Sequence, residues 1–267
     1  IEQYMIKAIR EAKVHTGWVN PREEYEEAVR KFVRAILDRS ARNPFLEEFL
    51  PFQAFVARCG MYNALAQLLV KLTAPGIPDC YQGTELWEFS LVDPDNRRPV
   101  DFEFRARLLQ ECQPGLGPDD VNRLALVRRL MESWEDGRIK LYLLQTGLRH
   151  RREHAALYLD GDYVPLECDG LYQSNICAFA RLHQEQAIVT IIPRLTAERV
   201  QASASSPQSD DPWQDTRVTV PSWKAGSHYI NLLTGEHLET VTEQERQVLP
   251  VGQVLRDCPV ALLGRCF

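Results

Sequence analysis

The pattern of apolar residues changes its period near residue 155, and this change most constrains the fold. Before it, apolar side chains recur every three or four positions, as in 61–72, which is typical of amphipathic helices. After it, the pattern takes a period of two, as at Ile176, Ala178 and Ala180, and the apolar run 187–192 is read as the partner of that segment in a pair of antiparallel strands. The sequence therefore predicts a mainly helical domain over 1–154 and an all-β domain over 155–267.

The helical half is expected to contain a well-defined second helix, which Asn20 caps and Pro21 opens. Its apolar residues between Tyr25 and Leu37 fall on one face. Its other face carries two pairs of opposite charges four residues apart, Glu26 with Arg30 and Glu27 with Lys31. This helix is therefore expected to pack on one side only and to leave these charges in solvent.

Local signals predict where other elements begin and end. Helical stretches are expected over 43–55, 61–72, 104–110, 119–134 and 138–150. Gly60 is expected to separate the first two, and Pro75-Gly76 to end the second. In the β half, Asp160-Gly161 is expected to turn a hairpin between Leu157 and Val164. Residues 196–211, with almost no large apolar residue, are expected to form a long loop.

Residues 75–101 are the most informative segment for function. Ile77–Tyr81 is expected to be a short strand, and the polar residues 82–85 follow its end. Polar loops at the carboxyl ends of strands form the active sites of barrels in which strands and helices alternate. One strand cannot close a barrel, so two interpretations remain open.

In the first interpretation, a helical domain simply contains a strand. In the second, the chain holds the last strand and helix of a (β/α)8 barrel whose earlier strands are absent, followed by an appended β-sandwich. The second is favoured because Ile77–Tyr81 has no partner strand in the first half of the sequence. The expected fold class is therefore mixed: a mainly α-helical N-terminal half that carries the end of a barrel, and an all-β C-terminal sandwich domain.

The same segment resembles a known family. Pro-Gly-Ile-Pro at 75–78, with Tyr81, Gly83 and Glu85, resembles the eighth-strand motif of the α-amylase clan of glycoside hydrolases. The longer runs 71–87 and 91–101, the second reading Leu-Val-Asp-Pro-Asp-Asn-Arg-Arg-Pro-Val-Asp, resemble the maltooligosyltrehalose synthase family of that clan. Further similar stretches lie upstream of residue 22 and downstream of residue 135, so the resemblance covers most of the chain.

This resemblance implies a (1→4)-α-D-glucan 1-α-D-glucosylmutase, which converts the reducing-end α-1,4 bond of a maltooligosaccharide into an α,α-1,1 bond in trehalose biosynthesis. It also implies retaining chemistry by three carboxylates in a site that excludes water. In the family these carboxylates follow the fourth, fifth and seventh barrel strands, all before the part that this chain resembles. The chain is therefore expected to be a C-terminal fragment without catalytic residues, inactive without the N-terminal catalytic part of the same polypeptide.

Two polar groups are candidates for substrate binding. They are Gln82, Thr84 and Glu85 in the loop after the expected strand, and Asp95, Asn96, Arg97 and Arg98 in the following run. These side chains either bond sugar hydroxyls or hold the loop in shape, since the two arginines can pair with nearby aspartates. Trp87 is expected to pack in the core rather than stack on a sugar. Asp136 and Lys140 either reach the reducing-end subsite or form a pair at a helix terminus.

The composition argues against several classes of function. The net charge of −6 and the lack of a long Lys/Arg block make nucleic acid or an anionic membrane a poor partner. No metal or cofactor is expected, because the six histidines are dispersed and no Cys-x-x-Cys pair occurs. The seven scattered cysteines indicate reduced thiols and a cytoplasmic protein.

Three alternatives remain open. The first is a non-catalytic glucan-binding module, in which Trp213 and Trp223 of the β domain hold the polymer. The second is a helical interaction protein. The third is another transglycosylase of the same clan, which would differ in its product.

Overall fold

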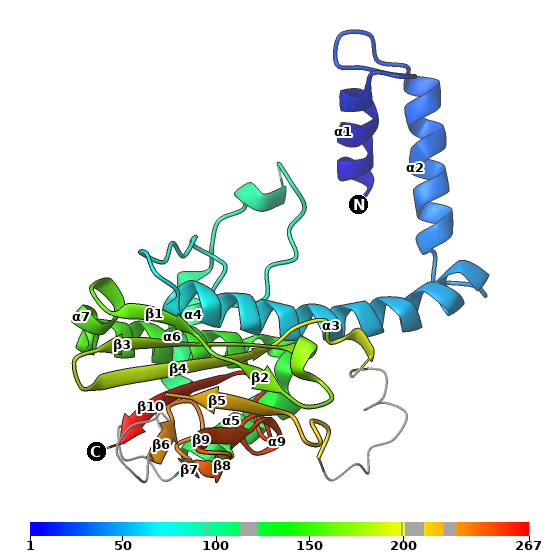
Figure 1. Cartoon of the computed structure of the whole chain (residues 1–267). Coiled ribbons are helices and arrows are strands. Elements are labelled where there is room, and N and C mark those ends of the chain that lie inside the picture. The colour runs from blue at the N-terminus through cyan, green and yellow to red at the C-terminus, as the bar shows by residue number, and fades with distance from the viewer. Residues whose placement is uncertain (94, 113–121, 199, 201–210, 222–227, 267) are drawn as a thin grey trace. The chain divides into compact units, whose positions relative to one another are not determined.

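The structure is a computed structural model that describes residues 1–93, 95–112, 122–198, 200, 211–221 and 228–266 (Figure 1). The chain forms two compact units. Unit 1 comprises 1–57 and 88–100, and unit 2 comprises 58–87 and 101–267. Unit 2 thus contains residues on both sides of the predicted boundary at 154 and 155. Each unit is described by itself.

The helices precede most of the strands in the sequence. The helices are α1 Glu2–Ala12, α2 Glu23–Leu37, α3 Pro44–Thr73, α4 Phe102–Cys112, α5 Arg123–Glu132, α6 Arg138–Glu153, α7 Ala155–Leu159 and α9 Val251–Val254. The strands are β1 Asp162–Pro165, β2 Cys168–Asp169, β3 Ile176–His183, β4 Gln186–Pro193, β5 Arg217–Val220, β6 His228–Asn231, β7 His237–Glu239, β8 Val241–Glu243, β9 Arg246–Pro250 and β10 Ala261–Cys266. Short 3₁₀ turns lie at Asp95–Arg97, Trp134–Asp136 and Gln173–Asn175.

In unit 1, α1 and α2 run antiparallel and side by side (Figure 1). Helix α2 begins at Glu23, with Arg22 as its N-cap residue. The backbone N–H of Arg22 donates to Oγ1 of Thr16 over 3.0 Å. The predicted start at Asn20 and Pro21 is therefore wrong, because a threonine earlier in the connection bonds the backbone where the helix begins.

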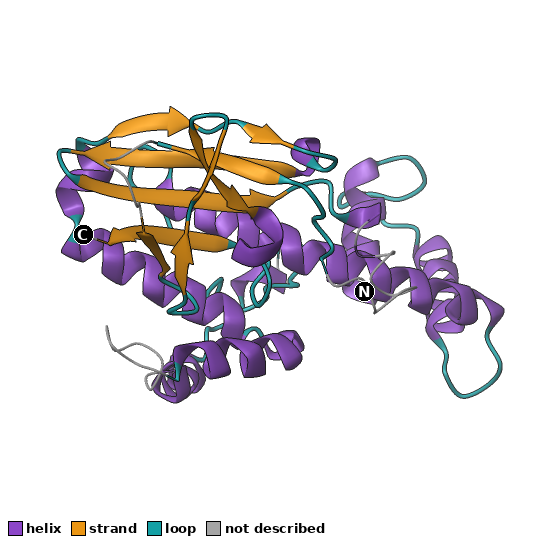
Figure 2. Cartoon of the chain, turned by 60° about the horizontal axis from the view of Figure 1, so that its bottom comes forward, coloured by secondary structure: helices purple, strands orange, loops and turns teal. Residues whose placement is uncertain are grey.

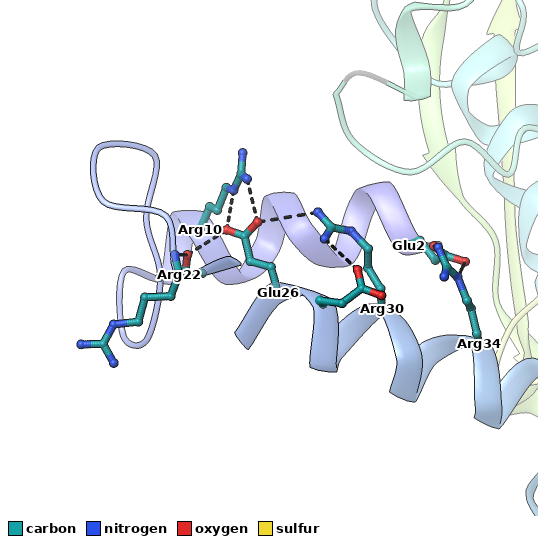
Figure 3. Close-up of polar contacts among 8 residues, drawn as sticks. Glu2, Arg10, Arg22, Glu26, Arg30 and Arg34 are labelled. Carbon is teal, nitrogen blue, oxygen red and sulfur yellow. Dashed lines mark hydrogen bonds and ion pairs between the residues drawn. The ribbon is translucent and has the colours of Figure 1, made fainter. Parts of the chain in front are cut away.

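Glu26 is the buried centre of this helix pair (Figure 3). Its carboxylate accepts hydrogen bonds from Nε and Nη2 of Arg10, both at 2.7 Å, and from Oγ1 of Thr16 at 2.8 Å. The bonds from Arg10 lower the pKa of Glu26 to about 2. The expectation that Glu26 faces solvent is thus wrong, since a charge that is paired on a neighbouring helix can be buried among apolar positions.

Helix α3 is continuous from Pro44 to Thr73, so the predicted break at Gly60 is wrong. A glycine inside a helix costs only about 1 kcal/mol relative to alanine, and the flanking helical residues override it. The part of α3 that lies in unit 2 contributes Leu65, Leu69 and Leu72 to the core, each fully buried.

The strands of unit 2 form two antiparallel sheets. Sheet A has the order β1-β3-β4-β10-β6-β7, and sheet B has the order β2-β5-β9-β8. The predicted pairing of 176–180 with 187–192 is confirmed, because Ala178 lies opposite Ile191 in the β3–β4 hairpin. The switch from helices to antiparallel strands is therefore correctly predicted.

Strand β4 shows how sheet A is covered on both faces. Ile188 and Ile192 pack with residues of α3, α5 and α6, and the helices lie on one side of the strands in Figure 2. Val189 and Ile191 belong to a second cluster, which includes Val218 of sheet B. Successive residues of a strand point to opposite faces, so β4 contributes to both clusters.

Ile77–Tyr81, the expected barrel strand, is irregular in this structure. Ile77 is 87% exposed and Tyr81 is 68% exposed. A strand needs a neighbour that satisfies its backbone hydrogen bonds. Among the described residues, all paired strands lie after residue 161, in sheets A and B. The prediction of a strand at 77–81 is thus wrong for this chain, and a barrel strand remains a prediction for a longer protein.

The predicted hairpin around Asp160-Gly161 is also wrong. Leu157 lies in the short helix α7, and Val164 lies in β1, which pairs with β3 instead. Leu157 is buried among the helices of the core. Short apolar runs fit either a helix or a strand, and here tertiary packing decides. Most of the long loop expected over 196–211 lies outside the described residues.

Candidate functional site

The loop that follows α3 is held by an arginine of α4. Arg105 donates from Nε to Oε2 of Glu85 and from Nη2 to the carbonyl oxygen of Gly83, both over 2.9 Å. Its Nη1 also donates to the carbonyl oxygen of Asp101 over 3.1 Å. Gly83 has a φ of +91°, a conformation that favours glycine. Glu85 therefore holds the loop in shape. Gln82 is exposed, whereas Thr84 and Glu85 are half-buried.

A pocket of about 340 Å³, here called the loop pocket, lies beside this loop in unit 2. Its polar and aromatic lining residues are Gln67 and Lys71 of α3, Asp79, Tyr81 and Thr84 of the loop, and Lys140 of α6. Thr84 is the one member of the predicted group among the residues that line it. Hydroxyl, amide, charged and aromatic side chains around a concave site are suited to a polyhydroxylated ligand.

Lys140 and Trp87 form part of the framework next to this pocket. Nζ of Lys140 donates to the carbonyl oxygen of Leu86 over 2.9 Å and lies 5.7 Å from the centre of the Trp87 ring. Nε1 of Trp87 donates to the carbonyl oxygen of Trp134 over 2.6 Å. The expected packing role of Trp87 is supported, because its ring lies against the core and its only donor is bonded to the backbone.

Asp136 anchors the start of α6. It accepts hydrogen bonds from the backbone N–H of Arg138 over 2.9 Å and from Nε of Arg138 over 2.8 Å. Arg138 also donates to Glu111 over 2.8 Å. Asp136 thus has the helix-terminal role that was one of the two expected options, although its partner is Arg138 and not Lys140. Lys140 lines the loop pocket, whereas Asp136 does not.

The second predicted group lies in unit 1, where its two exposed arginines form ion pairs with half-buried aspartates. Arg97 pairs with Asp93, and Arg98 pairs with Asp95. Oδ2 of Asp95 also accepts a hydrogen bond from the backbone N–H of Leu91 over 2.8 Å. The bond from Arg97 lowers the pKa of Asp93. These contacts match the expected pairing of arginines with aspartates, and sugar contact by Asp95, Asn96, Arg97 and Arg98 remains a prediction.

Two further arginines, which the sequence did not single out, hold the end of α3. Arg181 of β3 is 1% exposed and donates to the carbonyl oxygens of Thr73 at 3.2 Å, Tyr158 at 2.8 Å and Gly161 at 2.7 Å. Arg151 of α6 donates to the carbonyl oxygen of Leu72 over 2.9 Å and also to that of Gly76.

These bonds satisfy carbonyl groups that a helix leaves without partners at its C-terminus. Helix α3 forms one wall of the loop pocket, and its C-terminal end is therefore held by Arg181 of strand β3. A signal for Arg181 was present in the sequence, because it stands in an apolar strand directly after Ala178, Phe179 and Ala180.

The β half does not present its tryptophans in the way the binding-module alternative requires. Trp213 is 7% exposed and packs in the cluster shared by sheets A and B. A ring that stacks on a polymer must expose one face. Trp223 lies outside the described residues.

None of the described helices combines the length and the apolar character that a membrane-spanning helix needs.

A comparison with curated proteins and one with solved structures both find maltooligosyltrehalose synthases. No family model matches the chain. A protein of Mycobacterium tuberculosis strain H37Rv, whose name as a maltooligosyl trehalose synthase is assigned by inference, is 32% identical over 265 residues. That match covers 99% of this chain and 28% of the relative.

Solved structures give the same result. The maltooligosyltrehalose synthase from Arthrobacter ramosus is 30% identical with a TM-score of 0.73, over 99% of this chain and 30% of that one. Another structure, of a maltooligosyl trehalose synthase, is 28% identical with a TM-score of 0.66, over 99% of this chain and 30% of that one. The chain thus spans less than a third of the length of these relatives.

Proposed function

We propose that this chain is part of a maltooligosyltrehalose synthase, because it is similar over 99% of its length to a part of such proteins. The identity of 30% with a solved synthase, together with a TM-score of 0.73, supports this proposal on both sequence and structure. The proposed protein converts the reducing-end α-1,4 bond of a maltooligosaccharide into an α,α-1,1 bond, and its product ends in a trehalosyl unit.

The chemistry proposed for the longer protein is an intramolecular, retaining transfer. A carboxylate attacks the anomeric carbon and a carboxylic acid protonates the leaving oxygen, which gives a glycosyl-enzyme and a free glucose. The glucose then turns, and its anomeric hydroxyl attacks the glycosyl-enzyme, displaces the carboxylate and returns its proton to the acid group. Water must be kept out until this transfer is complete. These carboxylates are proposed to lie in the part of the relatives that this chain does not match. The matched part would comprise the end of the catalytic domain through residue 154 and a β domain from 155, in a cytoplasmic protein.

The loop pocket is the contribution that this chain makes to substrate binding under the proposal. The main support for this role of the pocket is that Arg105 bonds Glu85 and Gly83. These bonds fix the turn, and the turn places Thr84 at the pocket. Thr84 and Lys71 then face the same space as Asp79 and Lys140. Gln82 of unit 2 is proposed to contact sugar in the longer protein, and sugar contact is proposed separately for Asp95, Asn96, Arg97 and Arg98 of unit 1.

Product analysis of the longer polypeptide tests the proposal. With maltohexaose as substrate, we expect reducing ends to disappear without release of glucose, and the product to carry a non-reducing trehalosyl end. The 267-residue chain alone is expected to leave maltohexaose unchanged. New reducing ends would indicate a hydrolase, and longer and shorter reducing glucans would indicate another transglycosylase. Either outcome would contradict the proposal.

A matched pair of lysine variants tests the pocket in the same assay. Lys71→Gln removes a positive charge that lines the loop pocket, so KM for maltohexaose should rise by about threefold to tenfold. Lys31→Gln removes an exposed lysine from α2, outside the pocket, and should leave KM unchanged. Equal KM values for the two variants would exclude the loop pocket from substrate binding.

A further inference from the structure

Unit 2 contains a second pocket, of about 340 Å³, that shares no lining residue with the loop pocket. It lies between the start of α5, the end of α6 and one end of sheet A. Its charged and buried polar lining residues include Arg123, Thr146, Arg149, His150, Glu153 and Arg265, and we call it the arginine pocket. The proposed transfer reaction gives it no role.

The arginines of this pocket come from three different elements. Arg123 is the first residue of α5, Arg149 lies in the last two turns of α6, and Arg265 lies near the end of β10. Basic residues at the end of one helix are expected from the helix dipole, which they complement. The dipole of α6 does not explain arginines of α5 and β10 in the same pocket. Glu153 is the one acidic residue among the described residues that line it.

Arg123 places a positive charge in the buried part of the pocket. It is 5% exposed, and its Nη1 donates to the carbonyl oxygen of Leu232 over 3.1 Å. Placing a guanidinium at such a depth is costly unless hydrogen bonds hold it. The bond to Leu232 fixes the side chain of Arg123 where it lines the pocket.

The neutral groups of the pocket are placed to bond a ligand as well. Thr146 is 4% exposed and lines the pocket, and its hydroxyl also interacts with that of Tyr142 in the same helix. A hydroxyl can both donate and accept, so this contact leaves a position for a ligand. His150 lies 2.8 Å from the hydroxyl of Tyr158 through Nδ1, and its ring stacks on His154 at 4.3 Å. Burial, reinforced by the electrostatic effects of the neighbouring His154 and Arg149, lowers the pKa of His150 to about 3, so this ring is neutral near pH 7.

We propose that the arginine pocket binds a sugar-sized molecule that carries an oxyanion, with a phosphate monoester as the preferred group. Planar guanidinium groups bind phosphate and carboxylate oxygens in pairs of hydrogen bonds, which accounts for the charged part of such a ligand. The volume of about 340 Å³ exceeds what a bare phosphate ion fills, so it leaves room for a polyol. Thr146, Glu153 and Gln186 supply hydroxyl, carboxylate and amide partners for that polyol.

Isothermal titration calorimetry on the 267-residue chain tests this site with four probes. Glucose 6-phosphate is expected to bind most tightly, glucuronate more weakly, inorganic phosphate more weakly still, and glucose not at all. Binding of glucose as tight as that of either anion would overturn the oxyanion requirement. Inorganic phosphate binding as tightly as glucose 6-phosphate would overturn the polyol part of the proposal, and failure of both sugar anions to bind would overturn it entirely.

Arginine variants then locate the site. Arg149→Gln and Arg265→Gln should each weaken binding of glucose 6-phosphate by about tenfold, because each removes a charge that lines the pocket. Arg128→Gln is the control, since Arg128 pairs with Asp257 away from the pocket. A thermal midpoint recorded without ligand shows that each variant is folded. If all three variants bind like the unmodified chain, the anion binds elsewhere and the proposal is wrong.

Discussion

Nε of Arg105 donates a hydrogen bond to Oε2 of Glu85 over 2.9 Å, and the two side chains are 18% and 25% exposed. This pair connects α4 with the turn that carries Thr84 to the loop pocket. Because the pair is largely shielded from water, it contributes more than an exposed ion pair would. The turn is therefore held by a specific contact and does not depend on its own backbone alone.

Arg105→Ala should loosen this turn. The variant loses the bonds to Glu85, Gly83 and Asp101, so we expect a loss of about 1–3 kcal/mol in the free energy of unfolding of unit 2. Hydrogen exchange of the amides of 82–86 should also accelerate. Arg107→Ala, at an exposed position on the same helix, should change neither quantity measurably. Identical exchange rates in the two variants would count against a role for Arg105.

Two glycines give a matched test of packing around Trp87. Gly137 has a φ of +79°, and a Cβ there would lie 3.0 Å from the backbone nitrogen of Trp87. Gly137→Ala should therefore destabilise the chain by about 1–3 kcal/mol in urea unfolding. Gly60→Ala, inside α3 with nothing within 4 Å of the new Cβ, should stabilise it by about 0.5–1 kcal/mol. The prediction fails if both substitutions shift the midpoint in the same direction.

The buried Arg181 is expected to be the most sensitive of these positions. Arg181→Met leaves the carbonyl oxygens of Thr73, Tyr158 and Gly161 without their donor, at a cost of about 3 kcal/mol or more. Arg246→Met removes an exposed pair with Glu167 and should cost less than about 1 kcal/mol. Differential scanning calorimetry of the two variants measures the difference. A variant at 181 as stable as the one at 246 would show that these carbonyls do not need the guanidinium.

Glu26 makes the stability of unit 1 depend on pH in the acid range. Its pKa is lowered to about 2 in the folded chain, from an ordinary value of 4.5. A lowered pKa means that the carboxylate stabilises the fold fully above pH 4.5, and that this contribution is lost as the pH falls toward 2. Glu26→Gln should remove this dependence, whereas Glu27→Gln should keep it.

The measurement is the thermal midpoint of the α1–α2 region between pH 7 and pH 2, followed by NMR signals of Trp18, whose ring lies 5.1 Å from the guanidinium of Arg10. If the midpoint of the unmodified chain falls no more steeply than that of Glu26→Gln, the buried carboxylate is not the source of the effect.

The parts of the fold that the sequence predicted are those that local pattern determines. Strands β3 and β4 are apolar runs of strand length joined by a short connection, so their pairing follows from local pattern and turn alone. The change from helix to strand was also readable, because it extends over many residues. The predicted break at Gly60 is wrong, because a single weak helix former does not outweigh the helix-forming residues on both sides.

Features that depend on distant partners could not be predicted. Glu26 looks like a solvent-facing charge until Arg10 is placed beside it by the folding of α1. Ile77–Tyr81 is short and mostly apolar, as a buried strand can be, but a local pattern cannot supply the neighbouring strands that it would need. At the candidate site, Thr84 was predicted from the sequence, and Lys140 was one of two options for its region. Arg105 was not predicted, because no local pattern links that residue to Glu85.

The hydrogen bond from Arg181 to the carbonyl of Thr73 joins residues 108 positions apart. While the ribosome is synthesising the chain, α3 is complete long before Arg181 leaves the exit tunnel. The end of that helix, and the loop that continues from it, must therefore wait for β3 before they acquire their final anchor. A nascent chain halted before residue 181 would consequently remain open to proteases at this loop, even though every residue of the loop had already been made.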